Sequence, residues 1–313
     1  MKRNLLGKTG IEVSELCFGS LPFGPLQKNL PVEEAAALLK AAFDKGINFI
    51  DTAQTYKTYE HIKLALQGVK ERPVISTKSP AKTYEDMQKA VDEALAAMEL
   101  DYIDIFFIHA ARAGVEVFTD REPALRCLLD NKKQGKIKAV GISTHSVKVT
   151  SLAADRDEID VVFPIINIDG MGIIEGTREE MEAAIAKCGR KDKGVVLMKV
   201  LAGGTAADRY EEAVNYARSL EGYDSISIGM VSHDELVYNA DFFAGKAVGE
   251  LPEIKDKKIT IFDYLCKGCF TCIDTCPNHA ISQRGEVAVI DEKACLTCGY
   301  CVGACPQFAI RML

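Results

Sequence analysis

YIDIFFIH (102–109) decides the fold, because it is an almost continuous apolar stretch, rich in β-branched and aromatic residues, that ends in a polar side chain. Such stretches are typical of strands that are buried on both faces of a parallel sheet. Seven further stretches have the same character, at 15–20, 47–53, 73–78, 137–143, 161–167, 194–200 and 225–230. Together they predict eight parallel strands.

Helical patterns lie between these stretches, and some of their ends can be recognised. Thr83-x-x-Asp86 and Thr177-x-x-Glu180 are typical of capped helix N-termini. Cys188-Gly189 predicts the end of the helix that begins at Thr177. Eight alternating strand–helix units predict a (β/α)8 TIM barrel over residues 1–245, whose functional side chains should lie where the strands end.

The composition argues against several classes of protein. The chain has 313 residues, of which 48% are hydrophobic and 27% charged, as in a soluble globular protein. Its net charge of −7 argues against nucleic acid as a partner. No segment reaches the 18 apolar residues of a membrane span, and the basic N-terminus is not followed by the apolar run of a signal peptide. We therefore predict a cytoplasmic protein with no membrane partner.

The cysteines are concentrated near the end of the sequence. Of 11 cysteines, eight follow the spacing C-x2-C-x2-C-x3-C-P twice, at 266–277 and 295–306. A zinc ribbon needs no third cysteine inside each pair, and disulfides rarely persist in the cytoplasm. The doubled spacing instead matches bacterial two-cluster ferredoxins. We predict a small α+β ferredoxin-like domain at 257–313, joined to the barrel by a linker at 246–256.

In the two-cluster pattern, the fourth cysteine of each run binds the cluster of the other run. This predicts two [4Fe–4S] clusters. The ligands of the first are Cys266, Cys269, Cys272 and Cys305, and those of the second are Cys295, Cys298, Cys301 and Cys276. The three remaining cysteines, Cys17, Cys127 and Cys188, have apolar neighbours and are expected in the core.

Four polar residues stand at or just after the ends of predicted strands: Asp51, Tyr56, Lys78 and His109. Each alone could be a solvated charge or a structural hydrogen-bonding group. Together they suggest one chemistry, because a nearby ammonium favours ionisation of a phenol and a carboxylate keeps that ammonium charged. Such a phenol can protonate a carbonyl oxygen, and a histidine can orient that oxygen.

The sequence resembles aldo-keto reductases of the bacterial type that is fused to a C-terminal two-cluster ferredoxin domain. The resemblance rests on LLGKTGIEVSELCFGS (5–20), FIDTAQTYKTYE (49–60), STKS (76–79), YIDIFFIHA (102–110) and KAVGIST (138–144). It implies that Tyr56 is the general acid/base of carbonyl reduction or alcohol oxidation. Lys78 and Asp51 would then tune Tyr56, and His109 would position the substrate.

The same resemblance implies NADP or NAD as cofactor, although the matching residues are incomplete. The residues predicted to contact it are Gly19, Ser20, Ser143, Thr144, Asn167 and Asn239. Phe163 stands where the family has a glutamine, and Met198 where it has an aromatic residue. Gly229 and Glu235 occupy positions at which NADPH-dependent members place basic residues. NADH, or a flavin at the barrel mouth, therefore remains an alternative.

Three functions are consistent with these features. The first is an iron–sulfur oxidoreductase acting on a small carbonyl or alcohol. The second is an electron-transfer protein whose barrel docks a redox partner protein, and the third is a redox-sensing subunit that binds nucleotide without turnover. The presence of all four candidate catalytic residues, Asp51, Tyr56, Lys78 and His109, favours the first. The substrate stays unpredicted, because the ferredoxin domain replaces the family's C-terminal tail and leaves the loops at 110–122 and 202–208 as expected pocket walls.

Overall fold

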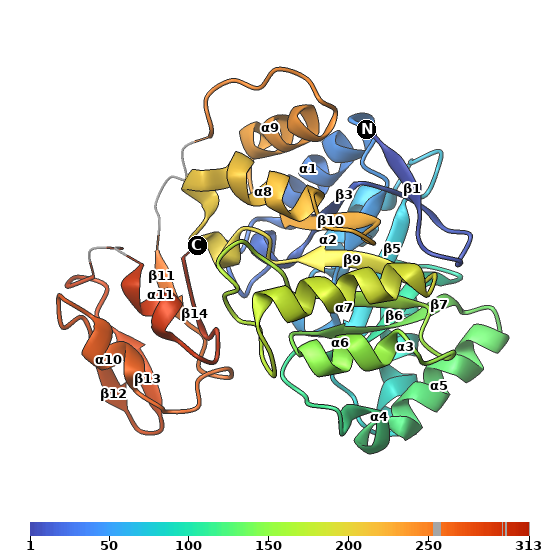
Figure 1. Cartoon of the computed structure of the whole chain (residues 1–313). Coiled ribbons are helices and arrows are strands. Elements are labelled where there is room, and N and C mark those ends of the chain that lie inside the picture. The colour runs from blue at the N-terminus through green and yellow to red at the C-terminus, as the bar shows by residue number, and fades with distance from the viewer. Residues whose placement is uncertain (253–257, 296, 298, 313) are drawn as a thin grey trace.

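The computed structural model describes residues 1–252, 258–295, 297 and 299–312 (Figure 1). Eight parallel strands close into a barrel in the order β10-β3-β4-β5-β6-β7-β8-β9. Their bounds are β3 Leu16–Gly19, β4 Phe49–Asp51, β5 Val74–Ser79, β6 Ile103–Ala110, β7 Ile137–Thr144, β8 Val161–Pro164, β9 Gly194–Met198 and β10 Ser225–Gly229. Each coincides with one of the eight predicted stretches, so the predicted barrel is confirmed.

The inside of the barrel is a packed core. Aromatic and aliphatic side chains from several strands fill it, among them Phe49, Phe107 and Phe163. An antiparallel hairpin of β1 (Arg3–Leu5) and β2 (Glu12–Ser14) adds Leu6 and Val13 to the same cluster. The hairpin precedes the first barrel strand, so its apolar side chains pack below that core. The opposite, carboxyl end of the strands is left for the site.

Helices surround the barrel (Figure 1). They are α1 Val32–Asp44, α2 Tyr59–Leu66, α3 Tyr84–Met98, α4 Val117–Asp120, α5 Glu122–Lys133, α6 Val147–Ala153, α7 Arg178–Arg190, α8 Tyr210–Arg218 and α9 His233–Phe243. Thr83 caps α3 and Thr177 forms a complete capping box on α7, as predicted. Their inner faces bury Cys127 and Cys188, and Cys17 is buried inside the barrel.

The predicted end of α7 at Cys188-Gly189 is wrong, because the helix continues to Arg190. Gly189 has another role there. A Cβ added at Gly189 would lie 2.4 Å from the Cα of Gly222, so the glycine allows the helix and the loop before β10 to approach closely.

A second, smaller domain follows the barrel. Strand β11 (Ile259–Ile261) pairs antiparallel with β14 (Ile310–Met312), and β12 (Ile281–Arg284) pairs with β13 (Val287–Ile290). Two short helices, α10 (Thr271–Thr275) and α11 (Tyr300–Ala304), pack with them. This is the predicted α+β arrangement. Residues 253–256 of the predicted linker, residue 257, Cys298 and Leu313 lie outside the described residues.

The small domain contacts the barrel near the carboxyl ends of the strands (Figure 1). Arg112, after β6, donates hydrogen bonds through Nη1 to the carbonyl of Gln307 and through Nη2 to that of Pro306. A Cβ added at Gly204 would lie 2.4 Å from the carbonyl oxygen of Met312, so β14 lies directly on the loop after β9. Within the described parts of the chain, no helix is long and apolar enough to cross a membrane.

Candidate active site

A buried ion pair forms the base of the site. Asp51 ends β4 and Lys78 lies in the neighbouring β5. The Nζ of Lys78 donates to the two carboxylate oxygens of Asp51 at 2.7 and 2.6 Å, and to the carbonyl of Thr52 at 2.8 Å. Ser76 also donates to Asp51, at 2.7 Å. Lys78 is only 1% exposed, so its charge depends on this carboxylate.

The tyrosine and histidine lie against this pair. Tyr56 is in a short 3-10 helix after β4, and the Nζ of Lys78 lies 5.0 Å from the centroid of its ring. His109, near the end of β6, has its ring 6.1 Å from that of Tyr56 in an edge-to-face arrangement. The structure thus brings all four predicted catalytic residues together. Among the described hydrogen bonds, those of Lys78 go to Asp51 and Thr52 and not to the Tyr56 hydroxyl.

The electrostatics favour one set of protonation states. Burial raises the pKa of the Tyr56 phenol, and the charge of Lys78 opposes this shift. Burial alone would lower the pKa of Lys78, but the charge and hydrogen bonds of Asp51, together with Tyr56 and Cys17, outweigh burial, so the pKa is raised. Burial and then the charge of Lys78 lower the pKa of His109 to about 3. Near neutral pH the site therefore holds a protonated phenol, a charged lysine and a neutral imidazole.

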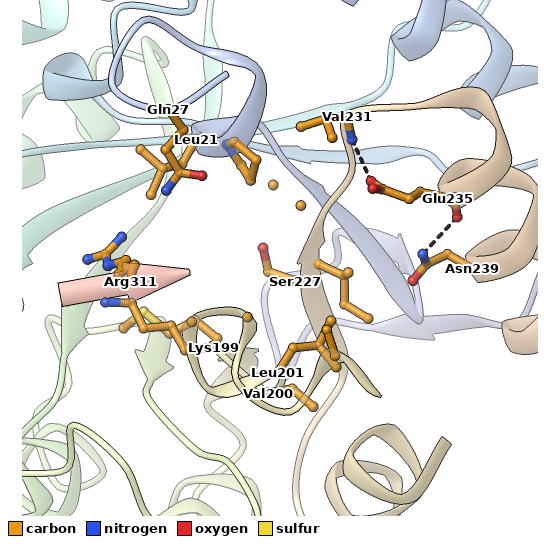
Figure 2. A pocket seen from close by; sticks show the side chains of 18 of the residues that line it. Leu21, Gln27, Lys199, Val200, Leu201, Ser227, Val231, Glu235, Asn239 and Arg311 are labelled. Atoms are coloured by element: carbon orange, nitrogen blue, oxygen red, sulfur yellow. Dashed lines mark hydrogen bonds between the residues drawn. The ribbon is translucent and has the colours of Figure 1, made fainter. Parts of the chain in front are cut away.

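A cavity of about 290 Å³ adjoins this cluster, and Figure 2 shows part of the cavity lining. Tyr56, Lys78 and Asp51 line the cavity, together with Phe163 and Met198, whereas His109 is not a lining residue. Phe163 and Met198 thus line the cavity at two of the positions where the sequence departs from the resemblance. Gly203, Gly204 and Ala207 of the predicted loop 202–208 line the cavity, but none of the described residues 110–122 does. That loop instead holds the small domain through Arg112, and the small domain supplies part of the cavity wall.

Two of the predicted cofactor residues, Gly19 and Asn239, line the cavity. The amide of Asn239 is already engaged, since its Oδ1 accepts from Tyr210 at 2.6 Å and its Nδ2 donates to the carbonyl of Glu235 at 2.8 Å. Ser143 is not a lining residue, but its Oγ is buried and has no hydrogen-bond partner within the described structure. Ser143 pairs with Phe163 of the neighbouring strand, which lines the cavity, so its orphaned hydroxyl fits a role in holding a polar ligand.

The other three predicted cofactor residues have internal partners. The Oγ of Ser20 lies 2.9 Å from that of Thr58, and the Oγ1 of Thr144 accepts from the amide of Ser146 at 3.0 Å. The Asn167 amide exchanges two hydrogen bonds with the backbone of Met171, at 2.8 and 2.9 Å. None of these three lines the cavity, so their side chains stabilise loops in this arrangement.

The sequence analysis missed three cations that line the cavity: Lys28, Lys199 and Arg311. Lys28 lowers the pKa of Glu235, although burial gives that carboxyl a raised pKa overall. Lys199 directly follows β9, where its position at a strand end was a usable signal. Arg311 lies in β14, in the last strand of the other domain, and nothing in the local sequence connects it with the barrel.

The cysteines gather around two further cavities in the small domain. One is lined by Cys266, Cys269, Cys272 and Cys305, and the other by Cys276, Cys295 and Cys301. The fourth cysteine of each run thus lies with the other run, in the crossed grouping expected of two clusters, while Cys298 lies outside the described residues. Within those residues, no three His, Cys, Asp or Glu side chains converge closely enough for a single metal ion.

Comparison with protein families agrees with this geometry. The model of the aldo/keto reductase family matches residues 15–240, and that of the 4Fe-4S dicluster domain matches residues 265–309. The chain belongs to the aldo/keto reductase family. It is an aldo/keto reductase barrel followed by a 4Fe-4S dicluster domain, and an oxidoreductase by descent.

Curated relatives of this aldo/keto reductase are distant. It is 28% identical over 218 residues to L-galactose dehydrogenase of Arabidopsis thaliana, covering 65% of this chain and 66% of the relative. It is 29% identical over 160 residues to 6-dehydroglucose reductase of Novosphingobium aromaticivorans, covering 45% and 51%. The chain thus spans between half and two thirds of the length of these relatives.

Solved structures also resemble this aldo/keto reductase. A crystal structure of a candidate aldo-keto reductase from Pseudomonas aeruginosa has a TM-score of 0.68 at 26% identity, covering 78% of this chain and 95% of that one. The holo form of an aldo-keto reductase from Bacillus halodurans, at 19% identity and a TM-score of 0.63, shares the fold.

Proposed function

We propose that this protein is an iron–sulfur oxidoreductase that reduces a carbonyl, or oxidises an alcohol, at the barrel mouth, with Tyr56 as general acid/base. The observation that carries the proposal is that Asp51, Lys78 and Tyr56 line one cavity, with the ring of His109 6.1 Å from that of Tyr56. Asp51 and Lys78 form a positioned, charged pair, and Tyr56 lies between that pair and His109.

The residues of the chain account for the proton in such a reaction. As the carbonyl carbon gains a hydride, its oxygen becomes negative and takes the proton of the Tyr56 hydroxyl, and a C–H and an O–H bond form in place of the C=O π bond. The charge of Lys78 stabilises the resulting phenolate. The neutral His109 can donate an N–H hydrogen bond to the same oxygen, because its pKa of about 3 leaves one nitrogen protonated and one free at neutral pH.

A nicotinamide dinucleotide is the hydride donor that we propose, and a bound reduced nicotinamide would supply the hydride. Support comes from the orphaned Oγ of Ser143 and from Gly19, which lines the cavity. At the other end of the cavity, Glu235 and Lys28 carry opposite charges (Figure 2 shows Glu235). This end supports NADH and NADPH alike, so the nucleotide has to be identified by titration.

We further propose that the cysteines around the two small-domain cavities bind [4Fe–4S] clusters that exchange electrons with the barrel site. One segment, 305–312, supports this coupling. Its Cys305 and Ile310 line one cysteine cavity, while Phe308 and Arg311 line the barrel cavity. Clusters carry single electrons and nicotinamide a hydride, so coupling needs a group that splits an electron pair, such as a flavin.

The test is an anaerobic titration of the purified protein with NADH and, separately, with NADPH, after the starting spectrum has been checked for flavin. Bleaching of the iron–sulfur absorbance by either nucleotide is the expected result and identifies the preferred one. If neither nucleotide binds or reduces the protein, the nicotinamide proposal is wrong. A flavin-bearing or ferredoxin-fed enzyme would then replace it.

The second candidate function is an electron-transfer or redox-sensing protein that binds nucleotide or a partner protein without carbonyl turnover. It is favoured by the 27% identity over 183 residues to a protein of Arabidopsis thaliana named "Probable voltage-gated potassium channel subunit beta", covering 53% of this chain and 54% of that one. Tight nucleotide binding without turnover of a panel of aldehydes and ketones would support this function over the first.

A further inference from the structure

The barrel cavity holds more positive than negative side chains. Its described lining contains four cations, Lys28, Lys78, Lys199 and Arg311, and two carboxylates, Asp51 and Glu235. Asp51 is paired with Lys78, and Glu235 accepts from the amide of Val231 at 2.7 Å. Neither carboxylate forms an ion pair with Lys199 or Arg311. The excess is notable in a chain whose net charge is −7.

Lys199 and Arg311 lack a charged partner within the described residues. No hydrogen bond or ion pair involves their side chains there, although Arg311 is only 8% exposed and its Nε is buried without a partner. Both cations instead lie against the ring of Phe308, at 4.7 Å for the Nζ of Lys199 and 5.5 Å for the Cζ of Arg311. A buried cation without an anion is costly, so the buried Arg311, with the half-buried Lys199 beside the same ring, indicates a ligand site.

The two side chains are held in place from both domains. Lys199 has a left-handed backbone (φ 59°) directly after β9, and Arg311 extends from the middle of β14. At Gly203 an added Cβ would lie 2.9 Å from the Cζ of Phe308 and 3.8 Å from the Cγ of Arg311. The loop after β9 therefore packs on Phe308 and Arg311 and limits where the Arg311 side chain can point.

The pair faces the reactive end of the cavity. Figure 2 shows Lys199 and Arg311 on one side and Glu235 and Asn239 on the other. The charges of Lys199 and Arg311 both help to lower the pKa of His109, after burial and the charge of Lys78. Mutual repulsion acts as well, because burial and then Arg311 hold the pKa of Lys199 well below its usual value. An anion between the two cations would remove this repulsion.

We propose that Lys199 and Arg311 bind an anionic group, a carboxylate or a phosphate, of the substrate, so that the enzyme acts on negatively charged carbonyl or hydroxy compounds. This inference rests on the proposed function. The planar guanidinium of Arg311 can hold two oxygens of such a group, and Lys199 adds a point charge. The dicluster domain thereby takes part in substrate recognition. The other source of such an anion is the pyrophosphate of the nucleotide, which the test must separate.

The experiment uses the full-length protein with its clusters, and two matched aldehydes, 4-carboxybenzaldehyde and its neutral amide, 4-carbamoylbenzaldehyde. The variants are Arg311→Met and Lys199→Met. Arg284→Met is the control, because Arg284 is an exposed cation on β12 of the same domain. Iron–sulfur absorbance checks that each variant keeps its clusters. The affinities of NADH and NADPH are measured in parallel by fluorescence titration.

We expect the wild type to prefer the acid, and each cavity variant to lose roughly 10- to 100-fold in kcat/KM for the acid, with little change for the amide. The control and the nucleotide affinities should stay unchanged. Equal rates for acid and amide in the wild type would overturn the inference. So would variants that weaken nucleotide binding and treat acid and amide alike, since the bound anion would then be pyrophosphate.

A failure of the proposed function can be told apart from a failure of this inference. If neither aldehyde is turned over, binding of 4-carboxybenzaldehyde is measured by calorimetry in the wild type and in both variants. Binding that is lost in the variants would support the anion site, although carbonyl reduction would have failed. Equal binding in all three proteins, or none in any of them, would overturn the anion site.

Discussion

Replacing Tyr56 with phenylalanine removes one hydroxyl from the cavity and leaves the ring beside Lys78 and His109. Because the hydroxyl is the proposed proton donor, we expect kcat for carbonyl reduction to fall by roughly 10²- to 10⁴-fold. Steady-state kinetics with an aldehyde substrate measures this, with the iron–sulfur spectrum unchanged. Tyr102→Phe is the control, because Tyr102 directly precedes β6 and lies at the opposite end of that strand from His109. Full activity of Tyr56→Phe would refute the assignment.

The buried pair of Asp51 and Lys78 predicts an unusual order of stabilities. Lys78→Met leaves the Asp51 carboxylate buried and uncompensated, which typically costs about 3–5 kcal/mol. The double variant Asp51→Asn/Lys78→Met removes both charges. We therefore expect the double variant to melt at a higher temperature than Lys78→Met alone, as followed by circular dichroism. A double variant that melts lower than the single one would mean that the charges are not coupled in this way.

His109 should make the barrel less stable in mild acid. Its folded pKa is about 3, below the value of about 6.5 of an unfolded histidine, so the unfolded state binds more protons between these values. Stability is then present above pH 6.5 and is lost as the pH falls toward 3. We expect the melting temperature of His109→Gln to fall less than that of the wild type between pH 7 and pH 5. His233 is exposed, and His233→Gln should show the same fall as the wild type. Identical losses in all three would contradict this.

At the scale of elements, Gly189 inside α7 predicts a substitution with the opposite sign to helix propensity. Alanine normally stabilises a helix relative to glycine by about 0.5–1 kcal/mol. At Gly189, however, the new Cβ would lie 2.4 Å from the Cα of Gly222, so α7 must shift. Such overpacking typically lowers the free energy of unfolding by about 1–3 kcal/mol. Gly189→Ala should lower the melting temperature. Gly303→Ala in α11, whose added Cβ would be 3.8 Å from Met171, should not.

The elements also show what local sequence patterns can predict. Alternation of apolar stretches and capped helices predicted the eight strands and the start of α7, because these depend on residues close in sequence. The end of α7 was mispredicted, because Gly189 resembles a helix terminator and only its contact with Gly222, 33 positions later, reveals its role. The loop 110–122 was assigned to the pocket for the same reason, since its docking through Arg112 depends on carbonyls nearly 200 residues away.

At the scale of the whole molecule, the four catalytic candidates of the barrel could be predicted from the sequence, whereas the pair of Lys199 and Arg311 could not. The positions of Asp51, Tyr56, Lys78 and His109 follow from strand ends, so the sequence sufficed to bring them together. Lys199 and Arg311 meet only because β14 of the small domain lies on the loop after β9. No pattern of spacing within either domain predicts that contact. The cavity is therefore a product of both domains, and its specificity depends on how they dock.

This dependence predicts an effect of cluster removal on substrate binding as well as on electron transfer. The small domain has a limited apolar core, in which the cysteine side chains themselves take part. Loss of metal from such a domain removes binding energy that is also folding energy. Without it, β14 should no longer hold Phe308 and Arg311 over the barrel. We expect chelator-treated protein to show a raised KM for 4-carboxybenzaldehyde and a nearly unchanged kcat, because Tyr56 and Lys78 belong to the barrel.

Two measurements make this last prediction decisive. The first compares KM for the acid and for its neutral amide in holo and metal-free protein, with NADH or NADPH supplied directly. The second is limited proteolysis, in which the metal-free small domain should be cut faster than the barrel. A metal-free protein that keeps the KM of the holo form for the acid would show that Arg311 does not depend on the clusters for its position, and that the small domain folds on the barrel without them.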